Sequence, residues 1–336
     1  MKAMVIRDPG EHGTLRLEEV PDPQPGARDV LVAVRATALN RADLSARQGS
    51  YRQQATARGG LPVAGLESAG EVVSVGAEVT RFSPGDRVMG QCSGGYAELL
   101  AVDERLLMSV PEKLDWFAAA ATPVALVTEY DALATSGRLE DGESVLIQAA
   151  GSAVGLMAVQ ISRFLGAGKI FGTVASREQA ELIAELGADV AIEHPGDDLG
   201  EIVARGTAEA GVDLVIDHVG GSVLGANLEA MALGARMISV GRLGPKVGEL
   251  DLDLLALKRL RLIGVTFRTR TIEEYGDCVR RAADQLMPAL ANGSIRPVVD
   301  HVYPLAQALA AQERMRENRH LGKIVLDVGA TVSSSG

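Results

Sequence analysis

The chain has 336 residues, 47% of them hydrophobic and 23% charged, and its 44 acidic and 33 basic side chains give a formal net charge of −11. This is the composition of a globular protein with a full core, and it excludes disordered, collagen-like and fibrous classes. The acidic balance argues against nucleic-acid binding. The length suggests about two domains.

The chain has only two cysteines, Cys92 and Cys278, and neither has a companion at metal-ligand spacing, which excludes a disulfide framework or a multi-cysteine zinc site. We expect both cysteines to be buried. The N-terminus carries no apolar segment of signal length, which predicts a cytoplasmic protein. The stretch from Ser144 to Ser162 has no charge, but its glutamines and glycines favour a buried strand, a tight turn and a helix over a membrane span.

The first third of the chain reads as a β-rich region, with branched apolar residues between glycine, proline and polar turns. An Ala-rich helical run then begins at Trp116. The expected strands are Val30 to Leu39, Ser68 to Gly76, Gly85 to Gly90 and Gly94 to Glu104.

From Ser144 onward, short apolar strands alternate with helices, a pattern typical of a parallel sheet covered on both faces. We expect Met231, Leu233 and Met237 to lie in its core and Asp217 to hold a loop at a strand end. The tail predicts strand, helix and strand. The predicted strands of the middle part are SVLIQA, KIFGTV, DVAI, DLVIDHV and RMISVG, and its helices are VGLMAVQISRFLG and REQAELIAELG.

The segment QAAGSAVG (Gln148 to Gly155) follows a buried strand and opens a helix, which is the context of a dinucleotide-binding loop. Small side chains at Ala150, Ser152 and Ala153 let phosphates approach the backbone, where the helix N-terminus favours negative charge. The usual G-x-G-x-x-G is degraded here, so an ordinary strand-to-helix turn remains the alternative.

The end of the next strand indicates which dinucleotide would bind. A carboxylate there would bind the ribose of NAD, but Ser176 and Arg177 occupy the position. A hydroxyl and a guanidinium suit a 2′-phosphate, which predicts NADP(H) over NAD(H). The alternative for Arg177 is a solvated residue of the first helical turn.

Several segments resemble the medium-chain dehydrogenase/reductase superfamily: GDRV at Gly85, GGYAE at Gly94, the VDLVIDHVGG strand and GKIVL at Gly322. In the zinc alcohol dehydrogenases of this superfamily, a cysteine stands at the position of Asn40 and a His-Glu pair at Leu66-Glu67. The cysteines of their structural zinc site would fall near Cys92, which stands alone. Neither the catalytic nor the structural zinc site can therefore be assembled, and we predict no metal site. His12, His218, His301 and His320 show no spacing for a metal either.

The segment ALNRADLSARQGSY (Ala38 to Tyr51) resembles the zinc-free quinone oxidoreductase (zeta-crystallin-like) family, close to the stress-inducible animal branch. The resemblance implies an α/β protein with a GroES-like β-rich catalytic domain (1–122 and 294–336). A doubly wound Rossmann domain with a parallel sheet (123–293) would bind NADP(H). The chain departs from the family at Ser152 and Ala153, usually glycines, and at Gln179, often a lysine.

Without a metal, hydride transfer needs a donor for the developing negative charge, and the Asn40 amide can supply it. Tyr51 could hydrogen-bond a quinone oxygen or stack on its ring. A turn residue and an exposed loop tyrosine are the respective alternatives, and Asp43 reads as a carboxylate in the first turn of a helix. The cofactor contacts expected for NADPH are Asn40, Thr128, Ala150, Gly151, Ser152, Ala153, Val154, Gly172, Ser176, Arg177, His194, Val219, Val240, Gly241, Arg268 and Lys323.

These features predict an NADPH-dependent reductase of quinones or related planar conjugated carbonyls, with the cofactor in the cleft between the domains. An enoyl-thioester or alkenal reductase and a non-enzymatic nucleotide-binding structural protein remain alternatives. RLRLIGVTF (Arg259 to Phe267) could be an edge strand of the central sheet. Family members commonly dimerise there, which implies a homodimer.

Overall fold

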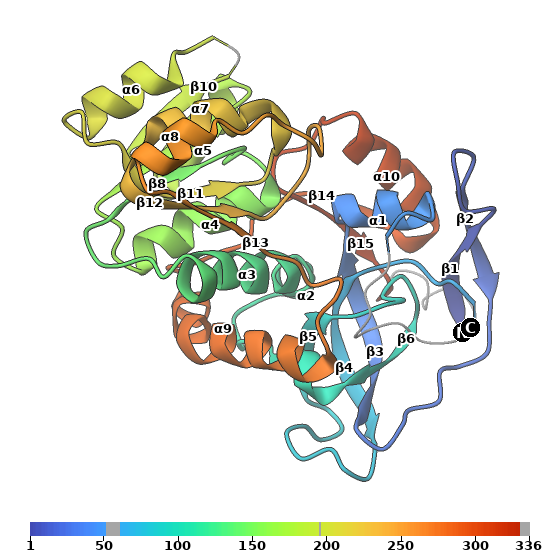
Figure 1. Cartoon of the computed structure of the whole chain (residues 1–336). Helices are drawn as coiled ribbons and strands as arrows, with labels where there is room; N and C mark the ends of the chain where they lie inside the picture. Colours follow the sequence, from blue (N-terminus) through green and yellow to red (C-terminus); the bar gives the residue numbers. More distant parts are fainter. Residues whose placement is uncertain (52–60, 195, 330–336) are drawn as a thin grey trace. The chain divides into compact units, whose positions relative to one another are not determined.

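The computed structural model describes residues 1–51, 61–194 and 196–329, and it contains two compact units (Figure 1). The first unit comprises Met1–Val127 and Phe267–Gly336, and the second comprises Thr128–Thr266. Helix α3 (Pro123–Tyr130) contains the boundary between them. Each unit has its own β-sheet.

The larger sheet of the first unit is mainly antiparallel and has the strand order β14-β15-β3-β4-β5-β7, with β6 also paired to β3. A separate antiparallel pair in the same unit consists of β1 (Lys2–Arg7) and β2 (Thr14–Glu19). The tail joins this sheet through β15, which runs antiparallel to β3. The predicted front strands and the strand–helix–strand tail are therefore confirmed. The elements are β3 (Asp29–Ala38), β4 (Glu67–Val75), β5 (Arg87–Gln91), β6 (Leu99–Asp103), β7 (Leu107–Ser109), β14 (Val299–Pro304), α10 (Ala308–Arg316) and β15 (Lys323–Asp327).

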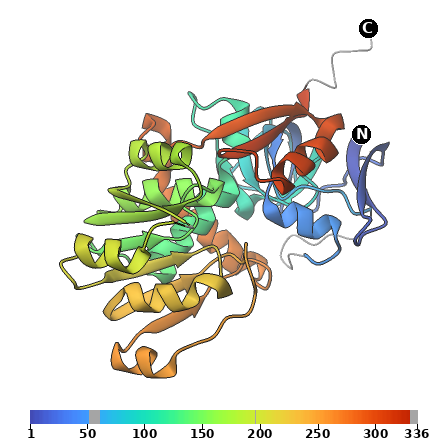
Figure 2. The ribbon, with the colours of Figure 1, turned by 90° about the horizontal axis from the view of Figure 1, so that it is seen from above.

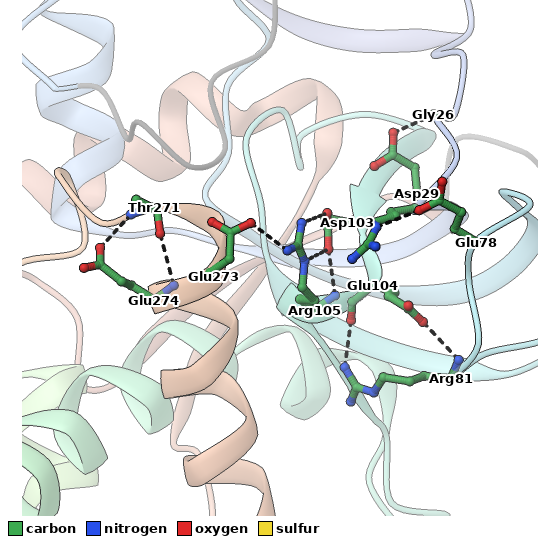
Figure 3. A network of polar contacts seen from close by, with 11 residues as sticks. Gly26, Asp29, Glu78, Arg81, Asp103, Glu104, Arg105, Thr271, Glu273 and Glu274 are labelled. Atoms are coloured by element: carbon green, nitrogen blue, oxygen red, sulfur yellow. Dashed lines mark hydrogen bonds and ion pairs between the residues drawn. The ribbon is translucent and has the colours of Figure 1, made fainter.

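The long helix α9 (Ile272–Asn292) packs on the first unit, against β7 and the short 3-10 helix Glu104–Leu106. Arg105 makes the polar part of this contact: its Nη1 donates to Glu273 at 2.9 Å, and its Nη2 donates to Asp103 at 2.7 Å (Figure 3). A Cβ on Gly276 would lie 2.8 Å from the Cβ of Arg105, so the glycine allows this close approach. These contacts explain why the segment beginning at Phe267 belongs to the first unit.

The second unit is a parallel six-stranded sheet with the order β10-β9-β8-β11-β12-β13. Counted along the chain this is 3-2-1-4-5-6, the order of a doubly wound dinucleotide-binding fold. The strands are β8 (Ser144–Ile147), β9 (Lys169–Val174), β10 (Val190–Glu193), β11 (Val212–Asp217), β12 (Met231–Ser239) and β13 (Arg261–Gly264). The expected fold class is confirmed.

Helices cover both faces of this parallel sheet (Figure 2). Phe171 packs in one core cluster with residues of α6 (Leu199–Gly206), α7 (Leu224–Ala230) and α8 (Leu252–Leu257). The next residue, Gly172, points the other way, toward Ile183 of α5 (Arg177–Glu185). Near-continuous apolar strands follow from this double coverage.

Two expectations about buried side chains, one for the cysteines and one for a stripe on β12, meet the structure here. Cys92 and Cys278 are both buried, as predicted. The prediction that Leu233 lies in the core is wrong, because its side chain is 64% exposed while Met231 and Met237 are buried. A bulge explains this, since Val212 pairs with Met231 but Leu214 pairs with Arg236, so the residues between them are displaced from the ladder.

The uncharged stretch from Ser144 to Ser162 forms β8, a turn and most of α4 (Ala153–Phe164), as expected. No helix in the ranges that the structure describes has the length and apolar character needed to cross a membrane.

Candidate functional site

The loop between β8 and α4 has the geometry of a phosphate-binding turn. Ser152 is the N-cap of α4, and its Oγ accepts a hydrogen bond from the Gly155 N–H at 3.1 Å. Ala149 has a φ of +54°, which lets the chain turn sharply out of the strand. The N–H groups of the first helical turn, at Ala153 and Val154, precede any intrahelical acceptor and so face outward along the helix axis.

Gly155 occupies a position where a side chain does not fit, whereas a Cβ on Gly151 would meet only the flexible end of the Gln179 side chain. A Cβ on Gly155 would lie 2.4 Å from the carbonyl oxygen of Ala149, so the helix packs directly on the turn. A Cβ on Gly151 would lie 2.4 Å from the Gln179 side chain, whose Oε1 accepts from the Ala175 N–H at 2.9 Å. Backbone, small side chains and the end of the Gln179 side chain thus line the turn, which is the setting of the pyrophosphate in a dinucleotide-binding fold.

The residues predicted to bind the adenosine phosphate lie together at the carboxyl ends of the neighbouring strands β9 and β10. Ser176 is the N-cap of α5, and its Oγ accepts from the Gln179 N–H at 3.3 Å. The Arg177 side chain is 87% exposed and its Nε lies 2.9 Å from Glu181. His194 follows β10 and donates its backbone N–H to Val174 at 2.9 Å.

The loops after β8 and β11 meet at the point where the strand order reverses, and His218 joins them. Its Nδ1 lies 2.8 Å from the carbonyl oxygen of Gln148, and its Nε2 lies 2.9 Å from Oε1 of Glu129. Burial lowers the pKa of His218, but the Glu129 carboxylate and the Gln148 carbonyl raise it by more, so the net direction is upward.

The predicted contacts Val219, Val240 and Gly241 lie around this reversal point. The Asp217 carboxylate accepts from the Val219 N–H at 2.8 Å and from the Gly220 N–H at 3.0 Å, which confirms its expected role in holding a loop. The Asp217 carbonyl accepts from the N–H groups of Val240 and Gly241 at 2.9 and 3.1 Å. Thr128 lies one residue before Glu129.

In the first unit, Asn40 belongs to a buried charged cluster with Lys323 and Glu67. The Lys323 ammonium donates to Oδ1 of Asn40 at 2.6 Å and to Oε1 of Glu67 at 2.5 Å. The Asn40 Nδ2 donates to the same Glu67 oxygen at 2.9 Å. Glu67 Oε2 accepts from the Val124 N–H at 2.8 Å, so both carboxylate oxygens are bonded.

Beside this cluster, Asp43 lies in the first turn of α1 (Arg41–Arg47), as expected. Its Oδ2 accepts from the Asn40 N–H at 2.7 Å and from the Tyr96 hydroxyl at 3.2 Å, while its Oδ1 has no hydrogen-bond partner among the described residues. Burial raises the pKa of Asp43 to about 7, against the lowering effect of these two hydrogen bonds. Asp43 therefore holds a proton for part of the time near neutral pH.

The other two predicted site residues of the first unit contact each other. The Arg268 guanidinium carbon lies 5.3 Å from the centroid of the Tyr51 ring, a cation–π distance. The Arg268 Nη2 also lies 3.5 Å from the carbonyl oxygen of Ser50. The two segments are thus held side by side although they lie far apart in the sequence.

The sequence reading did not identify Glu67, Glu129 and His218 as site residues. In the sequence, Glu67 stands out only because it occupies the position of a zinc-site residue, and His218 only as one of the histidines without metal-ligand spacing. A carboxylate in the apolar run VALVTEY and a histidine directly after a buried strand were the available signals. Neither signal reveals that the two side chains meet.

No group of three or more histidine, cysteine, aspartate or glutamate side chains in the described ranges is arranged to hold a metal ion. The first unit also contains a cavity of about 420 Å³ that includes none of the predicted site residues. It is lined by Arg35, Glu71, Asp115, Trp116, Phe117, Asp327 and Gly329.

Comparison with protein families gives two matches. Residues 26–112 match the alcohol dehydrogenase GroES-like domain, and residues 153–284 match the zinc-binding dehydrogenase domain. Among solved structures, a mycobacterial protein in complex with NADPH is 30% identical with a TM-score of 0.86, covering 97% of this chain and 100% of that one. The quinone oxidoreductase of Escherichia coli in complex with NADPH is 27% identical with a TM-score of 0.84, covering 97% and 99%.

Curated relatives include both single enzymes and sections of much larger ones. The chain is 32% identical to the quinone oxidoreductase of Lama guanicoe over 97% of each protein. It is also 32% identical to a mycocerosic acid synthase-like polyketide synthase of Mycobacterium tuberculosis, but it spans only 15% of that protein. The full-length match shows that this chain belongs to the quinone oxidoreductase family of the medium-chain dehydrogenase/reductase superfamily.

Proposed function

We propose that the protein is an NADPH-dependent, metal-independent reductase of quinones or related planar conjugated carbonyl compounds. The observation that carries this proposal is the loop at the reversal point of a 3-2-1-4-5-6 sheet, where Gly155 lets α4 pack directly on the turn and the start of the helix offers its N–H groups to a pyrophosphate. The similarity to two proteins solved with NADPH supports the same cofactor.

In this proposal, NADPH is bound by the loop Ala150 to Val154, with the 2′-phosphate at Ser176, Arg177 and His194. Gly172 keeps the floor of the site free of a side chain: its Cβ would lie 2.7 Å from that of Ala150. The nicotinamide half is bound by Thr128, Val219, Val240, Gly241, Arg268 and Lys323. When bound, the nicotinamide ring supplies a hydride.

Asn40 is the proposed donor to the acceptor oxygen as negative charge develops there. The Lys323 ammonium bonds its Oδ1 and withdraws electron density from the amide, which makes the Nδ2 hydrogens better donors. One of these hydrogens bonds Glu67 at 2.9 Å, while the Nδ2 is 3.5 Å from the Ala38 carbonyl, at the limit of a hydrogen bond. The second hydrogen therefore has only this weak partner, which a substrate oxygen would replace.

Tyr51 is proposed to orient the planar acceptor through its ring and hydroxyl. The Arg268 guanidinium near its ring restricts the orientation of the phenol. Asp43, whose pKa is about 7 through burial, is a proton-carrying group beside Asn40. The Asp43 carboxyl group can exchange a proton, which lets the net charge of the cluster adjust when negative charge develops at the acceptor.

The assay that tests this function follows NADPH and NADH oxidation with a quinone, an alkenal and an enoyl thioester as separate acceptors. The thioester is included because the chain also matches a polyketide synthase. Quinone turnover with NADPH, unchanged by a chelator, is the expected result. Turnover only with the alkenal or thioester would favour C=C reduction, and cofactor binding without turnover would favour a structural protein.

We also propose that the protein is a homodimer. β13 lies at the edge of the parallel sheet, as expected from the sequence, so its outer backbone groups can pair with a second copy. Leu252 and Leu257 of α8, the helix that precedes it, are 68% and 70% exposed. Light scattering should report a dimer, and the double substitution Leu252→Ser/Leu257→Ser should weaken it; a monomeric wild type contradicts the proposal.

A further inference from the structure

The pair formed by Glu129 and His218 is the one buried charged contact of the reversal point that the proposed chemistry does not use. The side chains are 0% and 2% exposed, respectively. The second oxygen of Glu129, Oε2, has no hydrogen-bond partner among the described residues. The carboxylate therefore depends on His218 for its hydrogen bonding. A carboxylate buried in an apolar interior without such a partner would lower the stability of the fold.

The geometry fixes how many protons the pair holds. A carbonyl oxygen can only accept, so the Nδ1 atom of His218 must carry a hydrogen and donate it to Gln148. One further proton then lies between Nε2 and Glu129, either on the ring or on the carboxyl group, across a distance of 2.9 Å. With that proton the pair is neutral overall and both contacts are satisfied.

The pair lies at a particular place in the fold. Gln148 follows β8, the first strand of one mononucleotide-binding half, and His218 follows β11, the first strand of the other half. In such a sheet the adenosine ribose lies at the end of the second strand, which is β9, so the other nucleotide lies on the side of β11 and β12. The His218 ring thus joins the two halves on the nicotinamide side.

Further contacts extend the connection toward the dinucleotide loop. The Gln148 amide donates to Asn227 at 2.6 Å, and its Oε1 accepts from the Thr173 hydroxyl at 2.9 Å. The same Thr173 oxygen accepts the Ala149 N–H at 2.8 Å. A single polar network therefore runs from Glu129 through His218 to the start of the dinucleotide loop.

We propose that Glu129 and His218 are positioning residues that fix the nicotinamide half of the NADPH site relative to the pyrophosphate loop. This inference rests on the proposed function. The pair acts through its neighbours, since Glu129 follows Thr128 and His218 precedes Val219. Loss of the pair weakens binding of the nicotinamide end and the rate of hydride transfer, while the adenosine end remains intact.

The test compares two ligands by calorimetry: NADPH, which reaches both halves, and 2′,5′-ADP, which reaches only the adenosine end. The main variant is Glu129→Leu/His218→Phe, because replacing both members with apolar side chains leaves no unpaired buried charge and preserves the fold. We expect its Kd for NADPH to rise roughly tenfold, as for the loss of a buried polar contact. Its Kd for 2′,5′-ADP should stay within about twofold of wild type.

Glu129→Gln is the conservative variant. Its amide can donate to Nε2 of a neutral His218, so the connection to Gln148 persists, and we expect near-wild-type NADPH affinity and kcat. Glu143→Leu/Arg236→Leu is the matched control: it removes another largely buried ion pair of the second unit, just before β8 begins. The control should leave the ratio of the two Kd values unchanged.

Equal losses for both ligands in Glu129→Leu/His218→Phe, or no loss for either, would overturn the positioning role. A Glu129→Gln variant whose affinity for NADPH falls as far as that of Glu129→Leu/His218→Phe would do the same. If the variants give these results while the wild type binds NADPH and turns over quinone, only this inference is refuted and the proposed function stands. A wild type that binds neither ligand refutes the proposed function and, with it, the inference.

Discussion

Each of the two units buries an ion pair, and the two pairs differ in how many hydrogen bonds hold their charged groups. In the first unit the Lys323 ammonium contacts three oxygens, those of Leu39, Asn40 and Glu67, and both oxygens of Glu67 are bonded. In the second unit the Glu129 carboxylate keeps one oxygen without a described partner, and its contact depends on one proton shared with His218. The ammonium of the first pair is thus held by several acceptors beside the proposed donor, whereas the second pair is held by a single hydrogen bond between its two members.

The strongest way to break this comparison is to remove the ammonium of the first pair. Lys323→Met leaves the Glu67 carboxylate buried without a counter-ion, and we expect a loss of about 3–5 kcal/mol in the free energy of unfolding. Urea denaturation measures it. The double variant Lys323→Met/Glu67→Gln should recover much of the loss, and a single-variant loss below about 1 kcal/mol would show that the pair is not held as described.

Asn40→Ala tests whether the amide that Lys323 contacts serves the reaction. Removing one preorganised donor to a developing oxyanion costs about 10²-fold in kcat. The Kd for NADPH should change little, because the cofactor would still be held by the second unit. Stopped-flow reduction and fluorescence titration separate the two quantities, and a fall in cofactor affinity with an unchanged kcat would assign Asn40 to binding instead.

Arg177→Ala sharpens the comparison from the exposed side, since this cation is surrounded by solvent rather than buried. We expect the Kd for NADPH to rise about tenfold while the Kd for NADH stays nearly constant, because only NADPH carries the 2′-phosphate. Arg205→Ala is the control, as it breaks the similarly exposed Arg205–Glu201 pair of α6. Equal losses for both cofactors would contradict the phosphate assignment.

Asp43 provides a pH-dependent test within the first unit. Its pKa is about 7 in the folded protein, above its ordinary value of 3.8, so the folded state binds more protons between these values. Its contribution to stability is therefore present below about pH 4 and is lost as the pH rises through 7, by at most about 1.4 kcal/mol per pH unit.

The Asp43→Asn variant isolates this term. Its unfolding free energy, measured in urea at pH values from 4 to 8, should gain on that of the wild type as the pH rises. Parallel pH profiles for the two proteins would show that Asp43 does not titrate in this range.

Local patterns predicted most of the fold, because strand and helix periodicity are properties of neighbouring residues. The turn between β8 and α4 and the edge position of β13 were predicted in this way. The prediction for Leu233 is wrong because it assumes regular alternation of buried and exposed residues along the strand. A bulge interrupts that alternation, and its position depends on pairing with the neighbouring strand β11. The expected domain boundaries and site residues stay predictions, and the variants of Asn40, Arg177 and Lys323 test three of these site residues.

The two buried pairs were beyond sequence reasoning for a physical reason. Glu129 and His218 are 89 residues apart, and Glu67 and Lys323 are 256 apart. No local pattern records which buried charge will meet which partner at such separations. Only the topology of each sheet brings these side chains together.

The separation of Glu67 from Lys323 also affects how the protein is made. At roughly 5–20 residues per second, the 256 residues between them take about 13 to 51 seconds to synthesise. During that time the Glu67 carboxylate has no ammonium to meet, while the uninterrupted second unit can already fold on the ribosome. The front sheet is completed only when the tail emerges, so a nascent chain halted before Lys323 should carry a folded nucleotide-binding unit and an unfinished front one.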